Sequence, residues 1–311
     1  MKTLRSFVLS LAAVFFALAL GVVLGARVLP GPMMSGLRGD KGDLQSQMAE
    51  LRDANAALNQ RLSAADQFDA QMSDRIVRGA LNGKSVVMFR TPDAESGDVD
   101  ALAALIEQSG GSITGTVGLT QEFLGANSAE KLRSVVNSPI LPPGAALNTA
   151  LVDPAAQTGD LLGIALLINR DPKIVPVGDE ARDTVLAALR DTGFLTFDRV
   201  AAADTAVVVT GGGLADDAGN QGPTVARFAA GLAPHGSGLV LAGRDGSADG
   251  VSAVALTRAD AALAGVVTTV DDVGTAAGRT TTVLALQSMI GGAPAAKYGV
   301  GQGAGAVTVP Q

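Results

Sequence analysis

From residue 83 onward, short apolar runs alternate with amphipathic segments, and this alternation constrains the fold more than any other feature. The runs with the length and composition of buried strands are residues 85–90, 113–119, 205–210 and 238–243. The segments with apolar residues at helical spacing are residues 99–109, 179–192 and 224–232. Repeated strand–helix alternation predicts an α/β fold, with a Rossmann-like, mostly parallel sheet flanked by helices.

The remaining parts of this region, residues 83–290, are less sharply patterned. Residues 121–170 are expected to be largely helical with a proline-rich break at 139–143, and residues 279–290 fit a closing helix or a closing strand. Residues 291–311 contain six glycines, two prolines and one charge. Such a composition buries little apolar surface, which predicts a flexible Gly-rich tail.

The N-terminus carries a run of 20 uncharged, mostly apolar residues, 7–26, preceded by Lys2 and Arg5. That length spans a bilayer as a helix, and the basic flank favours a cytoplasmic N-terminus. The prediction is a transmembrane anchor at residues 1–29, with the bulk of a single-pass protein lying extracytoplasmic at the cell envelope. A cleaved signal peptide is the alternative, with a weak cleavage site near Ala26, although the run exceeds the roughly 7 to 15 apolar residues usual for a signal.

Residues 30–82 are expected to form a linker and a coiled coil. Leucines recur every seven residues, which places one apolar side chain per heptad on one stripe of a helix running from about Asp43 to Arg78. The residues expected to make the helix–helix contact are Leu37, Leu44, Met48, Leu51, Asn55, Leu58 and Leu62. Asn55 stands at an a position, where asparagine fixes the register of a parallel dimer. The alternative is a solvated asparagine on a single helix packed against its own domain.

Composition excludes several classes of function. The chain has no cysteine, so it forms no disulfide and no thiolate metal site. A net charge of −7 gives no electrostatic footprint for nucleic acid. The seven methionines are scattered and fit core or interface positions better than a soft-metal site.

Candidate catalytic and binding groups are few, and each has a plain structural explanation. The glycines at 211–213 lack the spacing of a phosphate loop and fit a turn. Arg244 is expected to pair locally with Asp245 in a glycine-assisted turn. His235, the only histidine, stands in an expected exposed loop with no neighbour in the sequence to orient it. The adjacent pair Asp271–Asp272 fits a turn or helix cap, so we predict no catalytic residue, no cofactor and no resident metal.

Several segments of the chain resemble the actinobacterial copper transport protein MctB family. They are residues 119–123 (LTQEF), 127–138 (NSAEKLRSVVNS), 159–166 (GDLLGIAL), 182–194 (RDTVLAALRDTGF), 207–212 (VVVTGG), 219–222 (GNQG), 225–230 (VARFAA) and 241–248 (LAGRDGSA). The resemblance implies an outer-membrane channel that keeps intracellular copper low. The chain also resembles SteB, which implies a membrane-anchored coiled-coil protein that works with SteA to control septal peptidoglycan hydrolysis.

Taken together, the residues favour a non-enzymatic envelope scaffold or regulator that acts through its coiled coil, because one membrane helix encloses no channel by itself. The alternative is copper efflux as one component of an oligomeric outer-membrane channel, with copper as the transported ion only. The expected partners are the membrane and either a second copy or a partner coiled coil, such as a SteA-like protein or a peptidoglycan hydrolase. Nucleic acid is not an expected partner.

Overall fold

The apolar runs of the sequence become the central strands of a mostly parallel sheet, because strands that helices cover on both faces are apolar over most of their length. The computed structural model describes residues 12–23 and 31–310. In this part of the chain the strands are β1 (Ser85–Arg90), β2 (Ser112–Leu119), β3 (Leu195–Thr196), β4 (Thr205–Val209), β5 (Leu239–Ala242), β6 (Thr268–Val270) and β7 (Lys297–Tyr298). They form a seven-stranded sheet in the order β3-β2-β1-β4-β5-β6-β7. Only β3 pairs antiparallel with its neighbour, so the predicted mostly parallel sheet is confirmed.

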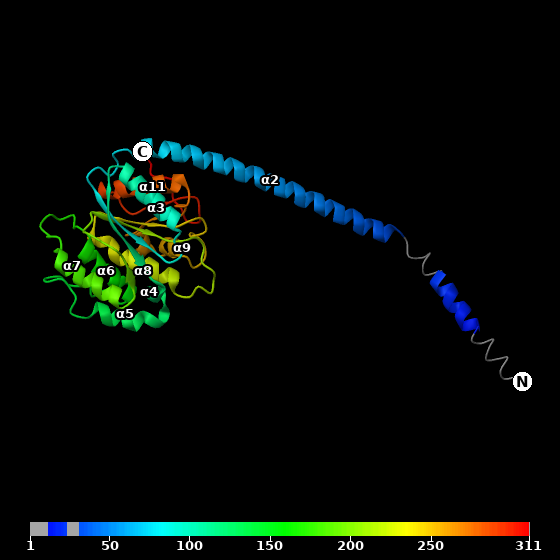
Figure 1. Ribbon diagram of the computed structural model, residues 1–311, viewed down its shortest axis with the longest axis horizontal. Helices are drawn as coiled ribbons and strands as arrows, with labels where there is room; N and C mark the ends of the chain where they lie inside the picture. The colour runs from blue at the N-terminus through cyan, green and yellow to red at the C-terminus, as the bar shows by residue number, and fades with distance from the viewer. Residues whose placement is uncertain (1–11, 24–30, 311) are drawn as a thin grey trace, which may run out of the picture. The chain divides into compact units, whose positions relative to one another are not determined.

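Helices cover both faces of this sheet (Figure 1). The longer ones are α3 (Ser96–Gln108), α5 (Ala129–Val136), α6 (Pro154–Leu166), α7 (Asp179–Asp191), α8 (Gln221–Leu232), α9 (Ala253–Ala259) and α11 (Ala276–Ile290). The shorter turns are α4 (Gln121–Leu124), η1 (Ala126–Ser128), η2 (Ala233–His235) and α10 (Ala261–Ala264). Residues 279–290, which fitted a helix or a strand, are therefore helical.

The two faces of the sheet bury two separate cores, because side chains alternate along each strand. Val87 and Phe89 of β1 belong to the larger core, which α4 to α9 cover. Val86 and Met88 belong to the second core, which α3 and α11 cover. The rings of Phe89 and Phe228 meet edge to face at 5.3 Å between centroids, which ties β1 to α8.

The long helix α2 (Gly31–Val77) begins twelve residues before the expected start near Asp43. Proline is tolerated in a first helical turn because it needs no amide partner there, so Pro32 does not prevent this start. The chain divides into two compact units, Met1–Ala64 and Ala65–Gln311, and the boundary falls within α2. The globular unit thus begins earlier than residue 83, since Val77 and Leu81 are fully buried in its second core.

Within the expected membrane anchor, residues 12–23 form a helix with exposed, mostly apolar side chains. The rest of that run, residues 7–11 and 24–26, lies outside the described residues. No helix in the described part of the chain combines the length and the hydropathy of a bilayer span.

The C-terminal residues do not form the free tail that their composition predicts. Lys297 and Tyr298 add the parallel edge strand β7 to β6, and Val309 packs against the second core. Gly299 donates its amide hydrogen to the carbonyl of Ala306, which folds the segment back on itself. The composition of residues 291–311 did not predict this structure because the segment is held by contacts with residues that are distant in the sequence.

Candidate functional site

The predicted coiled-coil residues lie on α2 as an exposed apolar stripe. Its described apolar side chains are 50–70% exposed: Leu44, Met48, Leu51, Leu58 and Leu62. The side chain of Leu37 lies outside the described residues. Asn55 accepts a hydrogen bond from the side chain of Asn59, one turn further along the same helix, at 3.0 Å. The structure therefore presents these residues together on one helix, with their apolar side chains exposed.

The base of α2 is engaged with the globular unit instead. Ser73 is buried, and its hydroxyl lies 2.8 Å from the hydroxyl of Thr280 on α11. The carboxylate of Asp66 accepts the backbone N–H of Ala276 at 2.6 Å, at the N-terminus of α11, where a helix favours negative charge. The next a positions of the heptad pattern, Asp69 and Ile76, line an apolar groove of about 540 Å³ beside α11 and residues 307–310.

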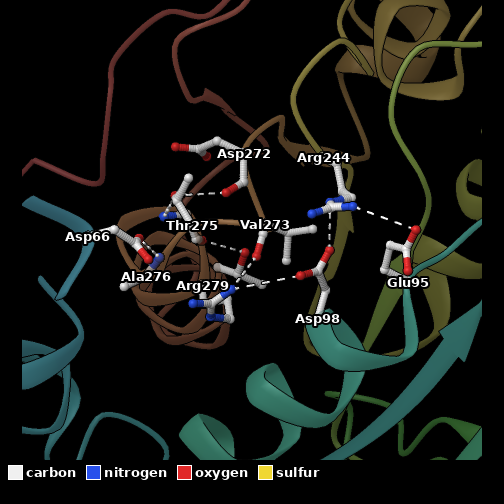
Figure 2. A network of polar contacts seen from close by, with 11 residues as sticks. Asp66, Glu95, Asp98, Arg244, Asp272, Val273, Thr275, Ala276 and Arg279 are labelled. Carbon is white, nitrogen blue, oxygen red and sulfur yellow. Dashed lines mark hydrogen bonds and ion pairs between the residues drawn. The ribbon is translucent and has the colours of Figure 1, made fainter. Parts of the chain in front are cut away.

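At the carboxyl edge of the sheet, charged side chains form the network in Figure 2. Asp98 of α3 lies between two arginines: Arg244 Nε is 3.0 Å from Oδ2, and Arg279 Nη1 is 3.9 Å from Oδ1. Arg244 also reaches Glu95, at 3.7 Å between Nη1 and Oε1. The expected local pair of Arg244 with Asp245 is therefore wrong, because Asp98 of α3 and Glu95, the residue that precedes α3, present two carboxylates to Arg244.

Ligands of open α/β sheets bind where the strand order reverses, which here is between β1 and β4. In this chain the protein's own groups fill that place. Asp93 accepts the N–H of Gly211 at 3.1 Å, so its carboxylate stands where a phosphate would be cradled. A Cβ built on Gly211 or on Gly212 would come within 2.6 or 2.7 Å of a backbone oxygen. The triglycine segment is a tightly packed turn, as expected, rather than an open anion site.

Beside this edge two adjacent acids, Asp271 and Asp272, are buried, and among the described residues only Asp271 has an ion-pair partner. Asp271 and Arg258 form a buried ion pair at 2.6 Å. Asp271 also accepts the amide hydrogens of Val300 and Gly301, and Arg258 donates to the carbonyl of Tyr298. This pair holds the C-terminal segment against the sheet.

Asp272 has no such counterion. Burial, and then the neighbouring charge of Asp271, raise its pKa to about 6. Its Oδ1 is buried without a hydrogen-bond partner in the described structure. Asp272 lies in a turn before α11, as expected, and its carbonyl accepts from Thr275. What the sequence did not reveal is the burial of both acids.

The single histidine also differs from expectation. His235 ends the 3₁₀ turn η2, with its side chain only 21% exposed, and its Nε2 lies 2.6 Å from Oδ1 of Asp160. The two residues are 75 positions apart, so no local sequence signal joined them. The expected exposed, unoriented histidine is therefore wrong.

Possible metal ligands do not gather in the described residues. No group of three or more histidine and acidic side chains is placed there to hold an ion. Met88 and Met289 lie in the second core, whereas Met48 belongs to the stripe on α2.

Comparison with known proteins identifies the family of the chain. The family described as copper transport outer membrane protein, MctB, matches residues 1–309. The chain is 57% identical to the copper transporter MctB of Mycobacterium tuberculosis over 314 residues, which covers 100% of both chains. The corresponding protein of Mycobacterium leprae is 56% identical over 317 residues, again with 100% of both chains covered. The chain belongs to the MctB family. The resemblance drawn from short segments therefore holds over the full length.

Proposed function

We propose that this MctB-family chain is a non-enzymatic, membrane-anchored protein of the cell envelope that acts by pairing the apolar stripe of α2 with a second helix. The observation that carries this proposal is the exposure of the stripe: five large apolar side chains at heptad positions are 50–70% exposed. Complete burial of one such side chain contributes about 1.5–3 kcal/mol, so a stripe of five favours association strongly.

The partner that fits this stripe best is a second copy of α2 in parallel register. Leucine at d positions with one asparagine at an a position is the pattern of a parallel coiled coil whose register the asparagine fixes. Asn55 is exposed and bonded only within its own helix, so its amide is free to exchange that contact for the Asn55 of a second copy.

Two observations support an envelope location. The family description refers to an outer membrane protein. The sequence places a 20-residue uncharged run behind two basic residues, which favours an N-terminal anchor with a cytoplasmic N-terminus. The relatives reported above are named for copper transport, so the proposal does not extend to control of septal peptidoglycan hydrolysis by a SteB-like mechanism.

The test is the mass of the full chain in detergent, measured by sedimentation equilibrium. The change of Leu44, Leu51 and Leu58 to serine should convert an oligomer to a monomer. A matched control changes Ala49, Ala56 and Ala57, exposed residues outside the a and d positions, to serine. The control has the same number of serines in the same helix and should keep the oligomer mass. A wild-type monomer, or equal masses for both triple variants, would overturn the proposal.

A second candidate function is copper transport across the envelope, with copper as cargo. Its support is that relatives 56–57% identical over their full length are named copper transporters. The copper content of cells that lack this chain, complemented with wild type or with either triple variant, tests it. Copper transport predicts that wild type lowers cell copper, and dependence on the stripe predicts that only the leucine variant fails to do so. Equal copper with and without the chain contradicts this candidate.

A further inference from the structure

A cavity of about 400 Å³ lies beside α6. Two proline-containing loops, residues 142–146 and 174–177, line it together with Ile164 of α6 and Leu167, which follows that helix. Its volume falls within the roughly 300–1,000 Å³ of small-molecule sites. Ile174 and Val175 in its lining are 53% and 82% exposed, which leaves apolar surface open to solvent.

One polar group in this lining is held in a fixed orientation. His235 lines the cavity, and its Nε2 bonds to Asp160, a residue only 4% exposed. A Cβ on Gly163 would come within 2.3 Å of the imidazole ring, so the glycine makes room for the ring against α6. The ring is thus packed on one side and bonded at one nitrogen.

The bonding of Asp160 determines what His235 offers to the cavity. The other carboxylate oxygen, Oδ2, accepts the backbone N–H of Asn148 at 2.7 Å. An ionised carboxylate only accepts hydrogen bonds, so in the neutral imidazole the proton lies on Nε2 and the lone pair on Nδ1. Nδ1 has no hydrogen-bond partner among the described residues, and it is not among their buried unpaired atoms. It remains available to a ligand.

We propose that this cavity binds a compact, mostly apolar molecule whose single hydroxyl group donates a hydrogen bond to Nδ1 of His235. The aliphatic and proline lining fits the apolar body. The lining contains no lysine or arginine, so nothing there neutralises a carboxylate or phosphate. The unpaired acceptor on the ring fits a phenol or an alcohol. This inference does not depend on the proposed function of α2.

The single histidine makes the test selective. Full-length chain labelled with ¹⁵N-histidine and purified without a histidine tag gives ring resonances from His235 alone. The probe is 4-methylphenol in detergent at pH 8. The free protein should show the Nε2–H tautomer, and the phenol should shift the Nδ1 resonance with saturation below about 1 mM.

Two matched ligands and one variant distinguish binding in the cavity from nonspecific binding. The ligand 4-methylanisole has nearly the same shape and partitions into detergent but lacks the hydroxyl donor, and 4-methylbenzoate carries an anion. Neither should shift Nδ1 at the same concentrations. Ile164→Trp, which fills the cavity, should abolish the phenol shift and keep the tautomer. If that variant fails to fold, Ala146→Trp, at an exposed lining residue, replaces it.

The proposal is overturned if 4-methylphenol leaves Nδ1 unshifted, or if the anisole shifts it equally. A shift with the benzoate alone would assign the cavity to anions and would also overturn it. A shift that persists in the cavity-filling variant would place the phenol elsewhere on the protein.

Discussion

The two parts of α2 carry the same heptad pattern but use it differently. Between Leu44 and Leu62 the apolar positions are exposed. From Asp66 to Val77 the helix contacts α11 through Asp66 and Ser73, and Val77 is buried in the second core. The contacts at the base use residues next to the a and d stripe rather than the stripe itself. A heptad repeat thus marks a helix surface suited to a helix partner. At the base of α2 the globular unit contacts residues beside the a and d positions, so it does not take the place of such a partner.

The strongest test of this difference between the two parts of α2 is to place one charge in each part. Val77→Asp buries an unpaired carboxylate at a position with no exposure, and we expect a loss of about 3–5 kcal/mol from the free energy of unfolding of the globular unit. Leu58→Asp, at a position 58% exposed, should change that free energy by less than about 0.5 kcal/mol while weakening association. Urea unfolding and sedimentation separate the two effects. Equal destabilisation by both variants would mean that the stripe already packs within its own chain.

A second contrast lies between two arginines near the sheet edge. Arg258→Ala leaves Asp271 buried and unpaired and frees the carbonyls of the C-terminal segment, so we expect a loss of about 3 kcal/mol. Arg244→Ala should cost less than about 1 kcal/mol, because Arg244 is 42% exposed and its ion pairs are screened by solvent. Thermal unfolding compares the two variants. Hydrogen exchange should show faster opening of residues 297–303 only in Arg258→Ala, and protection of that segment in this variant would refute the role given to the pair.

The burial of Asp272 predicts a pH dependence with a definite sign. Its folded pKa of about 6 lies above the ordinary value of 3.8, so the folded protein binds more protons than the unfolded chain between these values. Stability therefore falls as pH rises from about 4 to about 6, and the penalty is complete above that. Asp272→Asn should stabilise the protein at pH 7 by about 1–2 kcal/mol after allowance for solvent screening, with no gain near pH 3. Melting temperatures of wild type and Asp272→Asn at pH 7 and pH 3 test this prediction. An equal gain in stability at both pH values would show that ionisation of Asp272 is not the cause.

The sequence predicted those parts of the fold that depend on local pattern. β1 was expected at residues 85–90 and is found there, because its apolar run is buried on both faces and fixes both ends. The type of the segment that became α11 could not be predicted, since Thr280, Thr281 and Thr282 favour strands and the helix is buried over most of its surface. Periodicity does not distinguish a buried helix from a buried strand.

The polar sites were missed because their partners are far apart in the chain. His235 pairs with Asp160 at a separation of 75 residues, and Arg244, in the loop after β5, pairs with Asp98 on α3. The glycine-rich C-terminus looked free because its order comes from Arg258 and Asp271, which lie outside the segment. The stripe on α2 was predictable because heptad spacing is local.

The smallest expected effect concerns how firmly the base of α2 is attached. Ser73→Ala removes the hydroxyl that meets Thr280 and leaves that second hydroxyl without this partner, so we expect a loss of about 1 kcal/mol. Ser63→Ala, at an exposed position of the same helix, is the matched control and should be neutral or slightly stabilising, because alanine favours helix. Hydrogen exchange of residues 66–77 is the direct readout, since a weaker attachment lets this part of α2 open without unfolding the sheet. Unchanged exchange in Ser73→Ala would mean that Val77 and the contact of Asp66 with α11 hold the base by themselves.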